Sequence, residues 1–346
     1  MPRCLALLLF AVAALLPTPR ANAAPAAAPA GAPASYAARS DVRAFIEQMA
    51  SEHGFDRAAL RRTFARVQYQ REVVAAMERP LRAPPKWYDY ARAFMAPERV
   101  AAGVAYWNAH AGELARAEDR YGVPPGIVVA ILGVETYYGK NTGKYRTFDA
   151  LATLAFDYPR RAAFFRGELQ QFLLLSRELG VSPLAPKGSF AGAMGVPQFM
   201  PGSYRSYAVD FDGNGRTDLW DSPADVVGSV ANYLARHEWQ RGQPVLLAAA
   251  VADGGRDAVL RRIDGGLSEP RAMAAWAADG VTTIGAPEDL APDPVGVLLL
   301  EEKSADGEGA SFWIACHNFY VLTRYNRSRL YAAAVWELAR AIAAAR

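Results

Sequence analysis

An almost wholly apolar segment at residues 123–139, VPPGIVVAILGVETYYG, is the feature that most constrains how this chain can fold. Two prolines open the segment and a glycine closes it, which predicts a helix over residues 124–138. On that helix Glu135 shares a face with Val128 and Ile131, and this face is the one expected to be buried. The segment therefore predicts a core helix that carries one ionisable group.

The surroundings expected for Glu135 suggest a chemical role. Loss of solvent disfavours the charged form of a carboxyl group and so raises its pKa. A carboxylic acid that is still protonated near neutral pH can donate a proton to a glycosidic oxygen. The alternative is a structural glutamate at the helix end that points to solvent or pairs with Lys140 or Lys144. The segment alone leaves both interpretations open.

The first residues of the chain predict export. Residues 1–23 combine Arg3, the apolar run 5–16 and Ala-Asn-Ala at 21–23, which is typical of a secretory signal with a small-residue cleavage site. The apolar run is too short for a membrane anchor. Residues 24–35 are rich in Ala and Pro and are expected to form a disordered tether. The mature protein is therefore expected to be soluble and periplasmic.

Charge and cysteine content narrow the choice of partner. Without Arg3 and Arg20 of the leader, 36 basic residues face 35 acidic ones, so the net charge is only +1. This balance argues against nucleic acid as the main partner. Cys4 would leave with the leader, so Cys316 remains alone and no disulfide framework is expected. Its apolar neighbours predict a core position for Cys316.

The pattern along the chain predicts a mainly α fold with a small inserted β-containing subdomain, an α+β arrangement. Residues 36–242 and 316–346 are mainly helical, with Ser40 and Asp56 as expected N-caps. Residues 243–315 contain VLLAAAV and VGVLLLEEK separated by Gly, Pro and Asp, which predicts short strands around a small helix. Further helices are expected over residues 124–138, 160–179, 224–239 and 328–345.

Two loops carry polar groups in distinctive patterns. Residues 188–204, GSFAGAMGVPQFMPGSY, combine small residues that allow close backbone approach with Ser189 and Gln198 as hydrogen-bonding groups. An ordinary irregular loop is the alternative, and a phosphate-binding loop is a poor match because no Gly-Lys-Ser/Thr follows.

Residues 210–221, DFDGNGRTDLWD, fit the twelve-residue EF-hand loop, with glycine at position 6. The expected ligands are the side chains of Asp210, Asp212, Asn214, Asp218 and Asp221 and the backbone carbonyl of Arg216. Asp221 stands where a longer glutamate is usual, which predicts weaker binding. The alternative is an Asp/Gly-rich turn without metal. We expect structural Ca²⁺ and no organic cofactor.

Taken together, several segments resemble the B-type lytic murein transglycosylases, enzymes that cleave the glycan of bacterial cell walls. In chain order they are YGVPPGIVVAILGVETYYG, FDALATLAFDYPRRAAFF, KGSFAGAMGVPQFMPGSY, DFDGNGRTDLWD, VANYL and RYNRSRLYAAAVWELA. The resemblance runs from about residue 40 to the end and implies a lysozyme-like catalytic core.

The resemblance implies that Glu135 is the sole catalytic acid and base. It would protonate the oxygen between N-acetylmuramic acid and N-acetylglucosamine, and then accept a proton from the muramyl C6 hydroxyl, which attacks C1. Ordinary glycosidases need a second carboxylate, whereas here the substrate's own hydroxyl is held beside C1. The product would carry a 1,6-anhydromuramyl end. Asp149 and Asp157 are the nearest rival carboxylates downstream.

The family's substrate contacts can be placed on this sequence. The resemblance implies contacts from Tyr90, Arg160, Arg161, Ser189, Gln198, Tyr233, Tyr325, Asn326 and Tyr331. For each of these residues the alternative is core or surface packing, and aromatic residues are common in cores.

Two other functions remain open at this point. A calcium-dependent peptidoglycan-binding protein would keep the aromatic residues and the loop but would need no acid at Glu135. A lysozyme-type hydrolase would release reducing ends instead of anhydro ends. The expected partner is the peptidoglycan glycan strand. Proteins of cell-wall synthesis or division are further candidates, and the sequence does not identify one.

Overall fold

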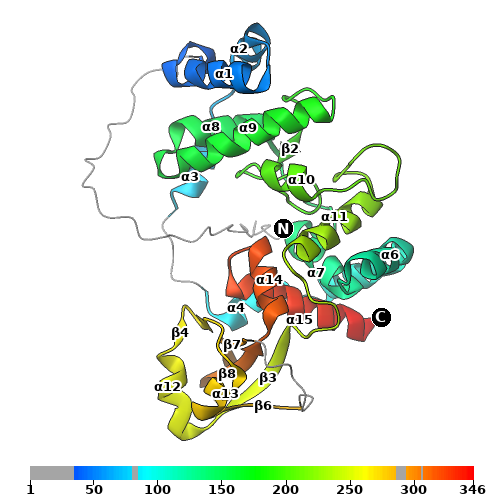
Figure 1. The fold of residues 1–346 in the computed structure, drawn as a ribbon, viewed down its shortest axis with the longest axis vertical. Helices are drawn as coiled ribbons and strands as arrows, with labels where there is room; N and C mark the ends of the chain where they lie inside the picture. The colour runs from blue at the N-terminus through cyan, green and yellow to red at the C-terminus, as the bar shows by residue number, and fades with distance from the viewer. Residues whose placement is uncertain (1–34, 80–84, 286–293, 305–306) are drawn as a thin grey trace, which may run out of the picture.

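The computed structural model describes residues 35–79, 85–285, 294–304 and 307–346. The predicted signal and nearly all of the predicted tether lie outside these residues. Within them, no helix is long and apolar enough to cross a membrane. The described chain is mainly helical, with a small six-stranded antiparallel sheet and a separate antiparallel pair of two-residue strands, β1 (Tyr145–Arg146) and β2 (Lys187–Gly188), so the predicted fold class is confirmed (Figure 1).

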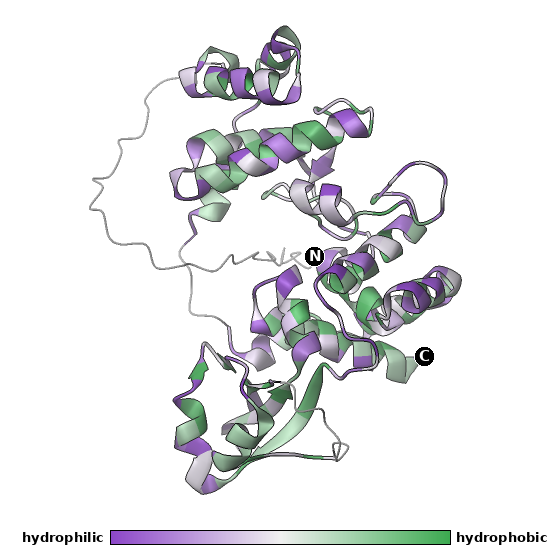
Figure 2. Ribbon diagram, viewed as in Figure 1, coloured by the Kyte–Doolittle hydropathy of each residue, from purple (hydrophilic) through white to green (hydrophobic). Residues whose placement is uncertain are grey.

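The helices form two neighbouring groups (Figure 1). In the first, α8 packs against α9, α3 packs against α8, and α10 packs against α9. The helices of this group are α1 (Ser40–His53), α2 (Arg57–Phe64), α3 (Arg71–Met77), α8 (Thr147–Asp157), α9 (Ala162–Glu178) and α10 (Pro201–Tyr207). Figure 2 shows hydrophilic and hydrophobic residues side by side on α9, as expected for a helix that buries one face.

The second group surrounds α7 (Pro125–Thr136). Helix α7 packs against α15, α5, α6 and α11. Those helices and their neighbours are α4 (Trp87–Arg92), α5 (Pro97–Ala109), α6 (Ala111–Tyr121), α11 (Pro223–Arg236), α14 (His317–Tyr325) and α15 (Arg329–Ala345). All residues of α7 from Gly126 to Val134 are buried, so the helix is apolar on every side and not only along one stripe.

The sheet lies at the opposite end of the molecule from α1 and α2 (Figure 1). Its strand order is β4-β5-β7-β8-β3-β6, and every pairing is antiparallel. The strands are β3 (Leu246–Val251), β4 (Ile263–Asp264), β5 (Leu267–Ser268), β6 (Val281–Thr283), β7 (Gly296–Ser304) and β8 (Gly307–Ala315). The short helices α12 (Arg256–Leu260) and α13 (Met273–Ala278) accompany them. All six strands lie between residues 243 and 315.

A small second core supports this sheet. It includes the buried side chains of Trp276, Ile314 and Cys316. The core position expected for Cys316 is therefore confirmed, and burial raises the pKa of its thiol to about 11. A thiol in this state is largely protonated at neutral pH.

Most predicted helix boundaries agree with the structure to within a few residues. Asp56 caps α2 by accepting a hydrogen bond from the Ala59 amide, and Ser328 caps α15. The prediction that Ser40 is an N-cap was wrong. Ser40 is the first helical residue, and Arg39 precedes it in an extended conformation with no side-chain cap.

The predicted core helix also ends earlier than expected. Helix α7 stops at Thr136, and Tyr137 and Tyr138 adopt left-handed conformations with φ of 53° and 57°. Contacts with α5 hold them there, because the two tyrosine hydroxyls donate to the backbone oxygens of Glu98 and Arg99. These tertiary contacts override the usual preference of such residues for negative φ.

Candidate active site and calcium loop

Glu135 occupies the last turn of α7 and is partly exposed, whereas its neighbours Val134 and Thr136 are buried. The hydroxyl of Tyr331 donates a 2.7 Å hydrogen bond to its Oε1 atom. The described residues contain no ion pair to Glu135. The alternative pairing with Lys140 or Lys144 is not observed, since these ammonium groups lie over tyrosine rings.

The electrostatic state of Glu135 agrees with the prediction made from its sequence context. Burial raises the pKa of its carboxyl group to about 7, although the hydrogen bond from Tyr331 acts in the opposite direction. A carboxylic acid with this pKa is substantially protonated at neutral pH and can still release its proton. Glu135 is therefore poised to act as both a general acid and a general base.

Three tyrosines face Glu135 from three elements. The charge of Glu135 raises the pKa of Tyr90 on α4, Tyr325 on α14 and Tyr331 on α15, in each case after burial, which is the larger cause. The rings of Tyr325 and Tyr331 stack at 6.3 Å with an angle of 11°. The structure thus brings three of the predicted site tyrosines together around one carboxyl group.

Tyr233 joins this group through aromatic contacts. Its ring lies 4.9 Å from that of Tyr325 and 5.6 Å from that of Phe199. Its hydroxyl donates to the backbone oxygen of Arg324, and the hydroxyl of Tyr325 donates to that of Pro197, both at 2.6 Å. Both hydroxyls are therefore satisfied by backbone oxygens within the fold.

The loop that contains Ser189 and Gln198 is held by its own polar groups. Ser189 Oγ accepts hydrogen bonds from the amides of Ala191 and Ala193. The Gln198 amide nitrogen donates to the backbone oxygens of Thr142 and Gly195, and Gln198 has a φ of 53°. Both side chains are partly exposed, so they fix the loop and remain accessible.

Asn326, Arg160 and Arg161 are the remaining predicted site residues, and no hydrogen bond or ion pair joins any of them to Glu135 within the described residues. The Oδ1 atom of Asn326 is buried and has no partner among the described residues, which is unusual for a polar atom. Arg160 is exposed, and Arg161 lies over the rings of Phe164 and Phe165 at 4.4 and 5.2 Å. No recorded contact joins either arginine to Glu135 within the described residues.

Arg99 supports the end of α7 and could not be assigned a role from the sequence. Its guanidinium donates to the backbone oxygen of Gly133 and lies 4.7 Å from the centre of the Tyr137 ring. At Gly133 itself, a Cβ atom would approach the Tyr138 hydroxyl to 2.6 Å. The glycine that precedes Val134 and Glu135 thus gives room to the tyrosine that closes the helix.

The predicted calcium loop is folded around the carboxylate of Asp210. One oxygen of Asp210 accepts from the amides of Gly213 and Asn214, and the other accepts from the amide of Gly215. The carboxylates of Asp210, Asp212 and Asp225 converge, with ligand atoms within 4.8 Å of one another. Carboxylate oxygens are ligands that Ca²⁺ prefers, so this donor set fits that ion.

Asp225 lies outside the twelve-residue pattern and was missed in the sequence. It is fully buried near the start of α11 and accepts from the amides of Phe211, Asp212 and Asp218. Asp221, at position 12 of the pattern, is exposed and is not part of the three-carboxylate cluster. The signal that could have identified Asp225 is an acidic residue in an otherwise apolar and small helix segment, ADVVGSVA.

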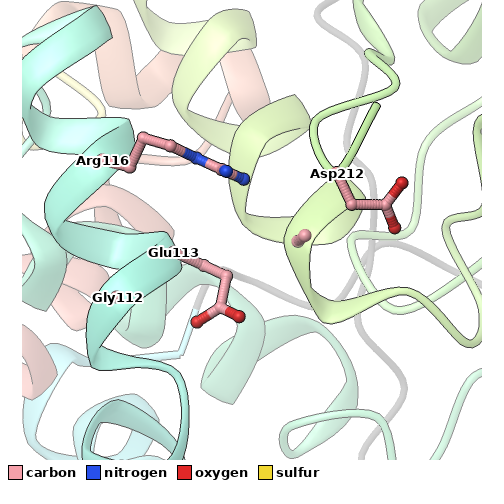
Figure 3. Close-up of a pocket in the computed structure, with 5 residues that line it drawn as sticks. Gly112, Glu113, Arg116 and Asp212 are labelled. Atoms are coloured by element: carbon pink, nitrogen blue, oxygen red, sulfur yellow. The ribbon is translucent and has the colours of Figure 1, made fainter. Parts of the chain in front are cut away.

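A pocket of about 220 Å³ lies between α6 and this loop (Figure 3). Gly112, Glu113 and Arg116 of α6 line it together with Asp212 and Ala224. The Arg116 guanidinium extends toward the loop, where it donates to the backbone oxygen of Phe211 at 2.7 Å. Glu135 does not line the pocket, which therefore adjoins the 210–221 loop and not the acid site.

Comparison with known proteins then places the chain in a family. The model of the transglycosylase SLT domain matches residues 37–340. The chain belongs to this family. The predicted resemblance is therefore confirmed.

Individual members of the SLT family agree closely with the chain. It is 42% identical over 320 residues to membrane-bound lytic murein transglycosylase B of Escherichia coli (strain K12), covering 90% of this chain and 85% of that protein.

Solved structures of the same family have the same fold. The soluble lytic transglycosylase SltB1 from Pseudomonas aeruginosa is 44% identical, with a TM-score of 0.81 over 88% of this chain and 99% of that chain. The Escherichia coli lytic transglycosylase Slt35 in complex with calcium is 42% identical, with a TM-score of 0.80 over 90% of this chain and 95% of that chain.

Proposed function

We propose that this protein is a lytic transglycosylase that cleaves the β-1,4 bond between N-acetylmuramic acid and N-acetylglucosamine in peptidoglycan. The observation that carries the proposal is the state of Glu135, a partly exposed carboxyl group whose pKa is raised to about 7 and whose recorded side-chain partner is Tyr331. Membership of the SLT family and the names of the relatives support the choice of substrate.

The reaction needs one group that gives and then takes a proton. Protonated Glu135 donates its proton to the glycosidic oxygen as the bond from that oxygen to C1 of the muramyl residue breaks. The Glu135 carboxylate then removes the proton from the muramyl C6 hydroxyl as that oxygen bonds to C1. Glu135 is protonated again, no water is consumed, and the product carries a 1,6-anhydro ring.

The rival carboxylates of Asp149 and Asp157 form salt bridges and hydrogen bonds elsewhere in the fold, which favours a single catalytic residue. Asp149 is 2% exposed, forms a 2.7 Å salt bridge with Arg146 and accepts from the amide of Gln68. Asp157 accepts from Arg39 at 2.5 Å and from the hydroxyl of Tyr36. Neither is among the causes of the pKa shift of Glu135. A hydrolase of the ordinary type would need a second carboxylate on the other side of the scissile bond.

The surrounding residues are proposed to hold the glycan and its peptide. Asn326 offers a buried acceptor without a partner among the described residues, which suits a substrate amide or hydroxyl. The partly exposed rings of Tyr90 and Tyr325 suit the apolar faces of sugars. The proposed contacts are Tyr90, Arg160, Arg161, Ser189, Gln198, Tyr233, Tyr325, Asn326 and Tyr331.

The loop at 210–221 is proposed to hold a structural calcium ion. The ligand set proposed from the sequence is Asp210, Asp212, Asn214, Asp218, Asp221 and the carbonyl of Arg216. To this set we add Asp225, because its carboxylate converges with those of Asp210 and Asp212. Calcium there would neutralise the repulsion among these carboxylates and tie the loop to α11.

The proposed setting of the enzyme is the periplasm. This placement rests on the predicted signal at residues 1–23. The division into a helical catalytic part, residues 36–242 with 316–346, and a subdomain at 243–315 likewise remains a proposal. Proteins of cell-wall synthesis or division are partners that such an enzyme would meet.

The proposal is tested by digesting purified peptidoglycan with the full mature chain. The released fragments are then identified by mass spectrometry. Fragments that end in 1,6-anhydromuramic acid are expected. Fragments with reducing ends would instead identify a lysozyme-type hydrolase. Binding to peptidoglycan without any release would identify a non-catalytic binding protein.

A further inference from the structure

One carboxylate of the inserted sheet connects two helices of the candidate active site. Glu301 lies on β7, and its two oxygens accept hydrogen bonds from different elements. Oε2 accepts from the backbone amide of Trp87, the first residue of α4, at 3.1 Å. Oε1 accepts from Nη2 of Arg329, the first residue of α15, at 2.9 Å.

The guanidinium of Arg329 is also hydrogen-bonded to the backbone of the sheet. Its side chain is 12% exposed, Nη1 donates to the backbone oxygen of Leu299 at 2.9 Å, and Nε donates to that of Gly265. At Gly266, which has a φ of 90°, a Cβ atom would lie 2.2 Å from Nε of Arg329. The turn between β4 and β5 therefore leaves room for the guanidinium, and all three of its nitrogens are bonded.

The two helices that Glu301 connects each carry a tyrosine that faces Glu135. Tyr331 follows Arg329 by two residues and donates the 2.7 Å hydrogen bond to Glu135. Tyr90 follows Trp87 on α4, and the two rings stack at 6.5 Å with an angle of 30°. A shift at the start of either helix would therefore move a group that contacts or faces the acid.

Glu301 carries the negative charge that its hydrogen bonds to Trp87 and Arg329 favour. Burial acts to raise the pKa of Glu301, but hydrogen bonds from its own amide and that of Trp87, together with the charge of Arg329, lower it overall. Glu301 is therefore ionised at neutral pH, as a charge-assisted bond to a guanidinium needs.

We propose that Glu301 is a positioning residue, through which the inserted sheet fixes Tyr90 and Tyr331 against Glu135. This inference rests on the proposed role of Glu135 as catalytic acid. It assigns the subdomain a part in catalysis that does not require it to touch the substrate. The titratable groups that face Glu135 are Tyr90 from α4, Tyr325 from α14 and Tyr331 from α15.

Kinetics of Glu301→Ala and Glu301→Gln on soluble glycan fragments of peptidoglycan test the proposal. Both variants are expected to lose about tenfold in kcat with KM changed by less than about twofold, because small displacements near the reacting groups cost rate more than binding. The alkaline limb of the pH profile should also move upward, since a looser Tyr331 no longer lowers the pKa of Glu135.

Glu302→Ala provides the matched control. Glu302 is the next residue of β7, is exposed, and its side chain makes no hydrogen bond or ion pair within the described residues, so its truncation should leave kcat and the pH limb unchanged. Melting curves show which variants fold, and if Glu301→Ala does not fold, the isosteric Glu301→Gln decides. A folded Glu301→Gln protein with kcat within twofold of wild type and an unmoved limb would overturn the proposal.

The outcome can be separated from a failure of the proposed function. If Glu135→Gln remains active, the assignment of the acid is wrong and the role of Glu301 is lost with it. If Glu135→Gln is inactive while the Glu301 variants behave as wild type, only the positioning role is refuted.

Discussion

The hydroxyl of Tyr331 lies 2.7 Å from Oε1 of Glu135, although 196 residues separate the two along the chain. The last helix of the fold therefore completes the surroundings of the acid carried by the central helix. A hydrogen bond to a carboxylate stabilises its charged form. Here that bond opposes the effect of burial, and the balance leaves the pKa of Glu135 at about 7.

Replacement of Glu135 by Gln removes the transferable proton and keeps the side-chain shape. Release of soluble fragments from peptidoglycan should fall by about 10²–10⁴-fold, the usual range for loss of a general acid. A melting curve close to that of wild type would show that the fold is intact. Near-normal release by a folded Glu135→Gln protein would refute the catalytic assignment.

The same variant should reveal how the pKa of Glu135 affects stability. The folded-state pKa is raised from 4.5 to about 7, so the native state binds this proton more tightly than the unfolded state does. Its contribution to stability is present below pH 4.5 and is lost as the pH rises through 7. Between these two pH values, the free energy of unfolding of wild type should fall by up to about 3 kcal/mol relative to that of Glu135→Gln. Parallel stability curves for the two proteins would contradict this.

Tyr331→Phe deletes the hydrogen bond but keeps the buried ring. The bond lowers the pKa of Glu135, so its loss should raise that pKa and move the alkaline limb of activity to higher pH. Tyr320→Phe is the control, because the Tyr320 hydroxyl donates at 2.8 Å to the backbone oxygen of Ser268 and not to the acid. An unchanged limb in Tyr331→Phe, or an equal shift in both variants, would show that this bond does not tune Glu135.

Local sequence patterns predicted α7 and placed Glu135 on its buried face, whereas the choice of Glu135 as the acid also needed the resemblance to a known family. An apolar run between prolines and a glycine predicts a buried helix whatever surrounds it, and desolvation then sets the direction of the pKa shift of Glu135. The contact with Tyr331 has no local signal, since it depends on how two distant helices pack. Tyr331 was selected only through the resemblance to a known family.

The features that the sequence did not predict also depend on contacts between segments that are far apart in the chain. The helix was expected to run to residue 138, just before Gly139, but packing against α5 places Tyr137 and Tyr138 in left-handed conformations. Asp225 was missed because a twelve-residue pattern counts positions along one loop, whereas α11 brings this carboxylate to the loop from outside it. Glu301 gave no signal in the sequence, because its partners come from two other segments.

Calcium should raise the melting temperature of the protein, because a ligand that binds only the native state stabilises it by about 2.7 kcal/mol at a hundred times its Kd. Asp210→Ala should abolish the rise, since the loop amides of Gly213 and Gly215 donate to the Asp210 carboxylate and hold it among the proposed ligands. A rise no larger than that produced by magnesium would contradict the calcium assignment.

Two conservative variants identify which carboxylate completes the site. Asp225→Asn should lose most of the calcium-dependent rise, because Asp225 converges with Asp210 and Asp212. Asp221→Asn should retain most of it, because Asp221 is not part of that cluster. The reverse result would restore the ordinary EF-hand ligand set, with position 12 as the last ligand.

Digestion in water enriched with heavy oxygen tests whether the substrate supplies its own nucleophile. When the muramyl C6 hydroxyl attacks C1, both ring oxygens come from the sugar, so anhydro products should carry no label. When water attacks, every new reducing end should carry one heavy oxygen at C1. Labelled reducing sugars as the main product would keep Glu135 as the acid, because both reactions begin with the same proton donation. They would also require a second carboxylate to activate water, and neither Asp149 nor Asp157 is free of other bonds. The label therefore distinguishes a site with one working carboxylate from a site with two.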